Sequence, residues 1–132
     1  MEFWRQTVTS TFKVTSEMIT EFAKLTGDDA PHHLHLDSAL ALGYEKILSQ
    51  GLLIMSLTGR ASSQYLEDIN RGGVTYGYDR IRFIKPVYAD SNLRVEYVPK
   101  SMNEKNIIVS EVGVLNDLGE TIFVANHLLK LL

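Results

Sequence analysis

The first strong pattern in the chain is a helical spacing of apolar residues between positions 16 and 25. Four of these residues fall on one face of an α-helix: Met18, Ile19, Phe22 and Leu25. Ser16 is suited to cap the N-terminus of this helix, and Gly27 is suited to end it. The residues from Asp28 onward are therefore expected to leave the helix on an irregular loop, where functional side chains often lie.

The rest of the chain predicts one buried helix and several strands. Residues 51–63 are apolar almost all round, which predicts a helix that is buried on most sides. Residues 3–14 alternate as in a strand, and four later segments rich in β-branched and aromatic residues are separated by turn signals. These segments are approximately residues 74–85, 90–100, 106–115 and 121–131. A long hydrophobic helix followed by antiparallel strands predicts an α+β fold in which a sheet wraps around the helix.

Composition and charge narrow the class of protein. A length of 132 residues with 45% hydrophobic and 22% charged residues is typical of a single globular domain spanning residues 1–132. A net charge of -3 argues against a nucleic-acid partner, which requires clustered cations. The sequence has no cysteine, no apolar run of membrane-spanning length and no signal-peptide pattern at its start. We therefore expect a cytoplasmic protein with no membrane partner.

Asp28 and His33 are the most informative candidates for chemistry. They bring a carboxylate and an imidazole close together in sequence, within the Gly/Pro-punctuated segment 26–33. Two such groups can act as general base and general acid on one water molecule. A further hydrogen-bond donor is expected from Gly51, which opens the predicted buried helix. A backbone N–H at a helix start is unpaired and lies at the positive end of the helix dipole.

Three blocks of sequence resemble the MaoC-like dehydratases, also called (R)-specific enoyl-CoA hydratases. Residues 22–33 resemble the family signature Gly-Asp-x-Asn-Pro-x-His, residues 44–51 resemble a segment that ends in His-Gly, and residues 79–90 resemble a Phe-x-x-Pro-Val strand and bend. The blocks follow in the family's order, and the resemblance covers nearly the whole chain. Three positions depart from the pattern: Ala30 stands in place of Asn, His35 in place of Asp and Gln50 in place of His.

The resemblance implies a hot-dog fold and a hydro-lyase that needs no cofactor. Such an enzyme adds water to a trans-2-enoyl thioester of CoA or acyl-carrier protein and forms the (R)-3-hydroxyacyl thioester. The resemblance further implies that Asp28 and His33 are catalytic, and that the Gly51 N–H polarises the thioester carbonyl as an oxyanion hole. It also implies a homodimer or a larger homo-oligomer. Two other functions stay open: a hot-dog acyl thioesterase, and a non-catalytic subunit that binds acyl thioesters.

Three cations are candidates for binding the phosphates of the carrier. Arg80, Arg82 and Lys85 lie near one end of segment 74–85. The two-residue period of a strand predicts that Arg80 and Arg82 share a face. A face that is simply solvated is the alternative interpretation of these three residues.

The remaining histidines have simpler interpretations. A metal cluster of His32, His33 and His35 is conceivable, but three histidines within four residues on a non-helical loop rarely present tetrahedral geometry. No metal site is therefore expected. An alignment slipped by two residues would make His35 the catalytic histidine, although it needs compensating gaps. His127, alone on a late strand, is expected to be structural.

Overall fold

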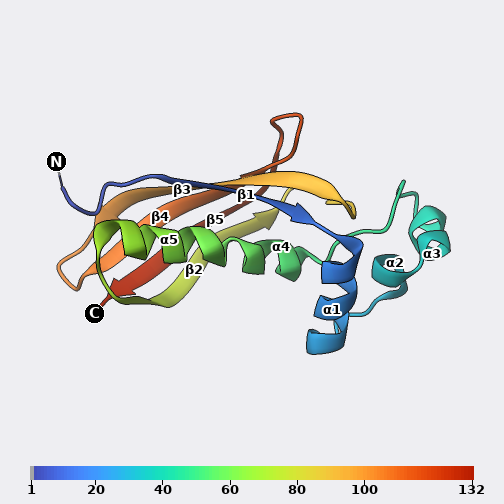
Figure 1. The fold of residues 1–132 in the computed structure, drawn as a ribbon, viewed down its shortest axis with the longest axis horizontal. Coiled ribbons are helices and arrows are strands. Elements are labelled where there is room, and N and C mark those ends of the chain that lie inside the picture. Colours follow the sequence, from blue (N-terminus) through green and yellow to red (C-terminus); the bar gives the residue numbers. More distant parts are fainter. Residues whose placement is uncertain (1) are drawn as a thin grey trace.

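The computed structural model describes residues 2–132 and shows an antiparallel β-sheet with helices along one face and at one end (Figure 1). In chain order, the elements are β1 (Val8–Val14), α1 (Ser16–Thr26), α2 (Pro31–Leu34), α3 (Leu36–Ala41), α4 (Gly51–Leu57), α5 (Gly59–Ile69), β2 (Gly73–Phe83), β3 (Ser91–Met102), β4 (Ile107–Leu115) and β5 (Thr121–Leu131). The five strands lie in the order β1-β3-β4-β5-β2, and every neighbouring pair is antiparallel. The predicted α+β architecture is therefore confirmed.

The strands lie close to where the sequence predicts them. The bounds of the four later strands differ from the predicted ones by no more than two residues. The first strand is shorter than predicted, because it begins at Val8 and not near Phe3. The residues before it form a turn in which the Arg5 N–H donates to the Glu2 carbonyl at 3.1 Å.

Helix α1 ends where the sequence predicts, but its cap is one residue earlier. Thr15 and not Ser16 is the N-cap, since its Oγ1 accepts from the Met18 N–H at 3.1 Å. Gly27 ends the helix with a φ of 79°, a left-handed conformation that glycine adopts without strain. The Gly27 N–H donates to the Ala23 carbonyl at 2.9 Å. The chain therefore leaves α1 along a defined direction.

The long helix predicted from residues 51–63 is formed by α4 and α5, which are separated only by Thr58 and run along the sheet (Figure 1). The side facing the sheet carries the buried residues Ile54, Ala61, Tyr65 and Ile69, and Leu53 is buried as well. Leu52, on the opposite side, is 56% exposed, and Arg60 is exposed as well. The prediction that this helix is buried on most sides is wrong, because the sheet covers only one side of it. Among residues 2–132, no helix is long and apolar enough to cross a membrane.

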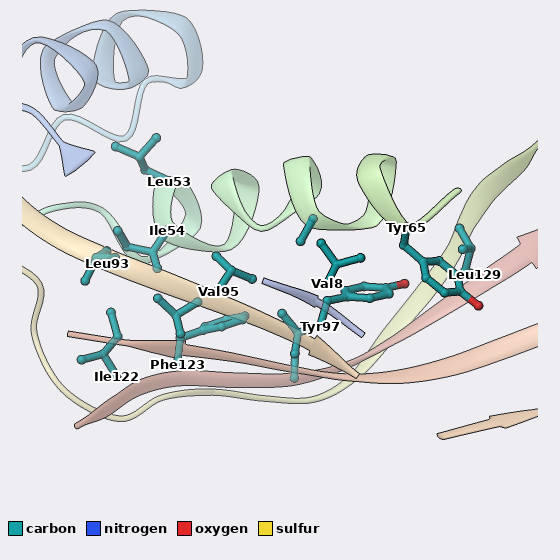
Figure 2. Packing of buried hydrophobic residues seen from close by; sticks show 14 of the residues in the cluster. Val8, Leu53, Ile54, Tyr65, Leu93, Val95, Tyr97, Ile122, Phe123 and Leu129 are labelled. Atoms are coloured by element: carbon teal, nitrogen blue, oxygen red, sulfur yellow. The ribbon is translucent and has the colours of Figure 1, made fainter. Parts of the chain in front are cut away.

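The hydrophobic core lies between α4–α5 and the sheet. Figure 2 shows Ile54 and Tyr65 from the helices on the side of the strands, where Val95 and Phe123 lie, and Leu53 on the other side of α4. Burying one large apolar side chain contributes about 1.5–3 kcal/mol. This core, and not the short helices, therefore supplies most of the stabilisation of the fold.

Helices α1, α2 and α3 gather at the end of the sheet where α4 begins (Figure 1). The segment that leads into α4 is bonded to the chain that follows β2. The Ser49 N–H donates to the Val87 carbonyl at 2.8 Å, and the Ala89 N–H donates to the Ile47 carbonyl at 2.9 Å. Because the Leu48 N–H also donates to the His32 carbonyl at 3.1 Å, the chain after α1, the start of α4 and the end of β2 meet at one place.

Candidate active site

Asp28 is held through its main chain at the exit of α1. Its N–H donates to Thr26 Oγ1 at 3.1 Å, and its carbonyl oxygen accepts from the Gln50 side-chain amide at 3.2 Å. The carboxylate side chain is 36% exposed. The side chain is therefore open to water while the backbone that carries it is fixed.

His33 lies on α2, a single helical turn that begins at Pro31, whose fixed φ suits the first position of a helix. The loop carrying the histidines was expected to be non-helical, and that expectation is wrong. His33 Nδ1 lies 2.7 Å from the Leu48 carbonyl oxygen. Because a carbonyl can only accept, Nδ1 carries the proton of the neutral ring and Nε2 keeps a free lone pair.

The free nitrogen of His33 faces Asp28. His33 Nε2 lies 3.8 Å from Asp28 Oδ1, and the His33 side chain is only 11% exposed. This distance is too long for a direct hydrogen bond, but both atoms can bond to one water molecule. The structure thus brings together the two proton-handling groups that the sequence singles out.

A pocket of about 340 Å³ lies beside this pair, between α2, the start of α4 and the segment after β2. Its wall includes His33, Gly51, Phe83 and Lys85. Apolar side chains complete the lining, including Ile54, Ile122 and Phe123. Asp28 is not among the wall residues. Its carboxylate reaches the site through its approach to His33 Nε2.

Gly51 places an unpaired N–H at this pocket. It is the first residue of α4, and within residues 2–132 no acceptor is bonded to its N–H. A Cβ at this position would lie 3.0 Å from two atoms of the Phe83 ring, closer than side chains normally pack. The close packing therefore favours glycine here. The same wall carries a hydrogen-bond donor and the free nitrogen of His33.

Lys85 is the only one of the three predicted carrier-binding cations that lines the pocket. It forms an ion pair with Glu120 on the turn before β5. The Lys85 ammonium, together with a hydrogen bond from Asn116, lowers the pKa of the Glu120 carboxyl. The positive charge of Lys85 at the pocket is therefore already paired with the Glu120 carboxylate.

Arg80 and Arg82 are not brought to the pocket. Arg80 has a φ of 54° and lies where the pairing of β2 with β5 shifts between Asp79 and Arg82, so the two-residue period does not apply there. Arg80 lines a separate groove with Glu96 and Glu111 on the outer face of the sheet. Arg82 is exposed and donates to the carbonyl of the preceding residue.

The other histidines of the α2 region differ in their surroundings. His32 lines the pocket, and its ring centroid lies 4.1 Å from that of His33. His35 is exposed at the junction of α2 and α3, and within residues 2–132 no ion pair joins it to Asp28. The same part of the chain contains no group of three or more His, Cys, Asp or Glu residues placed to hold a metal ion.

His127 lies in the core and does not line the pocket. Its Nδ1 is 2.7 Å from the Tyr97 hydroxyl, and its Nε2 is 3.0 Å from Thr75 Oγ1. Burial lowers the pKa of His127 from 6.5 to about 4, and burial also raises the pKa of Tyr97 to about 12. The neutral ring therefore joins β2, β3 and β5 through its two hydrogen bonds.

Two groups that organise the site were not identified as such from the sequence. The Leu48 carbonyl orients His33, but a backbone atom leaves no sequence signal. The Gln50 amide bonds the Asp28 carbonyl, and in the sequence Gln50 stands out only as a departure from a His-Gly pattern. That departure is the signal that points to this position.

Known proteins match the chain over most of its length. The family model of the MaoC like domain matches residues 5–118. Among curated proteins, a UPF0336 protein of Streptomyces coelicolor is 29% identical over 124 residues, which cover 89% of this chain and 83% of the relative.

Solved structures share the fold. The (R)-hydratase from A. caviae involved in PHA biosynthesis matches with a TM-score of 0.88 at 22% identity, covering 97% of this chain and 96% of that chain. The C-terminally truncated HadBC (3R-hydroxyacyl-ACP dehydratase) complex from Mycobacterium tuberculosis matches with a TM-score of 0.85 at 24% identity, covering 98% of this chain and 97% of that chain. The hot-dog fold is therefore confirmed.

Proposed function

The chain belongs to the MaoC-like domain family, and on this basis we propose that it reversibly adds water to trans-2-enoyl thioesters to give (R)-3-hydroxyacyl thioesters of CoA or acyl-carrier protein. The observation that carries the proposal is the 3.8 Å approach of His33 Nε2 to Asp28 Oδ1 beside the pocket. A carboxylate, an imidazole and a backbone N–H are the three groups that this reaction needs. The stereochemistry and the carriers follow from the family resemblance.

In the proposed hydration, one water molecule is bonded to both Asp28 and His33. One of the two groups removes a proton from the water as its oxygen bonds to C3, and that proton then passes from the pair to C2, because neither the Asp28 carboxylate nor the free Nε2 of His33 carries a proton at the start. The net change is the addition of one hydrogen and one hydroxyl, and the same two groups exchange roles in dehydration. General acid–base catalysis of this kind contributes roughly 10²–10⁴-fold to the rate.

In the proposed reaction, the Gly51 N–H stabilises the negative charge that develops during this addition. As the water oxygen bonds to C3, negative charge builds up on the thioester oxygen. The Gly51 N–H, which has no acceptor within residues 2–132, donates to that oxygen in the proposal. A donor of this kind is worth about 2.7–4 kcal/mol in the transition state.

We propose that Lys85, and not Arg80 or Arg82, contacts the phosphates of the carrier. Lys85 lines the pocket, whereas Arg80 lines a groove on the outer face of the sheet. Because Lys85 is paired with Glu120, a phosphate would have to compete with that carboxylate. The contribution of Lys85 to carrier binding is therefore expected to be small and to fall with added salt.

A panel of trans-2-enoyl thioesters on CoA and on carrier protein tests the proposal, with loss of the enoyl absorbance as the readout. We expect the unaltered protein to hydrate members of the panel and Asp28→Asn to lose this activity. Asp29→Asn is the matched control, because Asp29 is the adjacent carboxylate and is exposed. Equal activity of the unaltered protein and Asp28→Asn would contradict the proposal.

The other two functions give different results in the same panel. Release of free thiol would identify an acyl thioesterase, in which water attacks the carbonyl carbon. Binding of the thioesters without turnover would identify a non-catalytic subunit. Either outcome, without loss of the double bond, would overturn the hydratase proposal.

We also propose that the chain works as a homodimer or a larger homo-oligomer. Large apolar side chains at or next to the pocket wall are exposed, namely Leu52 at 56%, Phe83 at 50% and Ile84 at 51%. A second copy covering them would remove this apolar surface from water. Analytical ultracentrifugation checks the proposal, and a monomer at micromolar concentration would contradict it.

A further inference from the structure

Gln50 is a fully buried amide that bonds two separate segments of the chain. Its exposed fraction is 0%. Its Nε2 donates to the Ile19 carbonyl at 2.9 Å and to the Asp28 carbonyl at 3.2 Å. Because both partners can only accept, these contacts fix which end of the amide is the nitrogen. The amide orientation is therefore set by the protein itself.

The two carbonyls that accept from Gln50 differ in whether they have another hydrogen-bond donor. Ile19 lies inside α1, where the regular helical pattern supplies a donor to its carbonyl. Asp28 lies outside any helix, and within residues 2–132 no backbone N–H donates to its carbonyl. Gln50 thus satisfies a carbonyl that has no other donor in this part of the chain.

Together with Thr26, Gln50 holds both polar groups of the Asp28 main chain. The Asp28 N–H donates to Thr26 Oγ1 at 3.1 Å, and the Asp28 carbonyl accepts from Gln50. These bonds fix the peptide planes on both sides of the Asp28 Cα. The carboxylate can then move only through its own side-chain rotations, which limits how far it can stray from His33.

The other end of the Gln50 amide is in an unfavourable environment. The Gln50 Oε1 is buried and accepts no hydrogen bond within residues 2–132. Leaving a buried polar atom unpaired costs about 1–3 kcal/mol. This cost offsets much of what the two bonds from Nε2 contribute, so the net effect of Gln50 on stability is expected to be small.

We infer that Gln50 is a positioning residue, which holds the Asp28 main chain against the start of α4 and so sets the spacing between the Asp28 carboxylate and His33. This inference rests on the proposed function. Gly51, the proposed oxyanion donor, is the next residue, and the Leu48 carbonyl holds the His33 ring. The four residues from 48 to 51 thus position all three proposed catalytic groups.

The test compares Gln50→Met, which keeps the length of the side chain but removes both donors, with Tyr97→Phe. Tyr97→Phe also removes a buried hydrogen bond, to His127, but it lies outside the pocket. We expect Gln50→Met to lower kcat by about 10–100-fold with KM changed by less than about threefold, because misplacing a catalytic group by about 1 Å can cost about 10²-fold. Tyr97→Phe should lower Tm and leave kcat unchanged.

A double-variant comparison separates positioning from a general loss of structure. If Gln50 acts through Asp28, then Gln50→Met in an Asp28→Asn background should lower kcat by no more than about twofold. An equal loss in both backgrounds would overturn the inference, as would full activity of Gln50→Met. If Gln50→Met does not fold, Gln50→Asn takes its place, because it keeps the amide but withdraws it by one methylene.

Hydrogen exchange gives a readout that does not need activity. Gln50→Met should speed amide exchange in residues 28–30 relative to the unaltered protein, and Tyr97→Phe should not. Unchanged exchange in this loop would overturn the inference even if the proposed reaction is correct. Conversely, faster exchange in a protein that hydrates no thioester would leave Gln50 as the residue that holds this loop and would refute the proposed function alone.

Discussion

Replacing His33 with Asn separates the two roles of this histidine. The amide nitrogen of Asn can occupy the place of Nδ1, so His33→Asn keeps a donor for the Leu48 carbonyl, which lies 2.7 Å from Nδ1. The substitution removes Nε2, the atom that lies 3.8 Å from Asp28 Oδ1. The variant therefore keeps the bond that orients the side chain and loses the atom that would handle the proton.

The two contributions differ in size. Even complete loss of the hydrogen bond to Leu48 would cost only about 1 kcal/mol. Because the variant keeps this bond, Tm is expected to change by no more than a few degrees. A general acid or base contributes roughly 10²–10⁴-fold, which corresponds to about 2.7–5.5 kcal/mol in the transition state. A large loss of kcat/KM in a variant that remains folded would assign that loss to Nε2.

The assay is the initial rate of absorbance loss with crotonyl-CoA, after circular dichroism has shown that the variant is folded. His35→Asn is the control, because His35 is a neighbouring histidine that is exposed and has no ion pair with Asp28. If His33→Asn kept more than about a third of the kcat/KM, Nε2 would take no part in the reaction. If His35→Asn were the inactive variant, the slipped alignment would be correct and His33 would be the wrong residue.

Three further predictions concern the carboxylate, the start of α4 and the core. Asp28→Asn should lower kcat by roughly 10²–10⁴-fold. Adding His33→Asn should cost little more, since residues that act as one unit are non-additive, and fully additive losses in kcat/KM would refute a shared role. Gly51→Val should suppress turnover, because its Cβ alone would lie 3.0 Å from the Phe83 ring and its methyl groups would crowd the N–H; a folded variant with full activity, checked by circular dichroism, would exclude the oxyanion role. For His127, burial lowers the pKa from 6.5 to about 4, so between these pH values the unfolded chain binds a proton that the folded chain does not. The free energy of unfolding should therefore fall by about 3 kcal/mol as the pH drops through this window and level off below it; urea unfolding that gives the same pH dependence for His127→Gln would contradict this.

The elements that could be predicted from the sequence have local signals. The apolar spacing and Gly27 define α1, and alternating strands bounded by turn residues define the sheet. The cap of α1 was assigned to the wrong residue because Thr15 and Ser16 are adjacent capping types, which only the hydrogen bond to Met18 distinguishes. Asp28 and His33 could be paired from sequence because one short turn joins them.

The features that could not be predicted depend on contacts between distant segments. An apolar helix does not reveal which of its sides another layer covers, so the exposure of Leu52 was missed. Arg80 lies in a bulge that interrupts the alternation of β2, and a two-residue period cannot anticipate that shift. The bond from Gln50 to Asp28 joins residues 22 positions apart, and only folding brings them together.

The strand order also bears on how the chain folds during synthesis. The three inner strands β3, β4 and β5 come last in the sequence, whereas β1 and β2 form the two edges. Val8 pairs with Tyr97 and Gly73 pairs with Leu131, so each edge strand is made well before the strand with which it pairs. Contacts of such long sequence separation slow folding and prolong the time for which apolar segments are open to chaperones and to aggregation. The segment that carries Asp28 and His33 is therefore made before β3, β4 and β5, and it cannot settle against the complete sheet until those strands have followed.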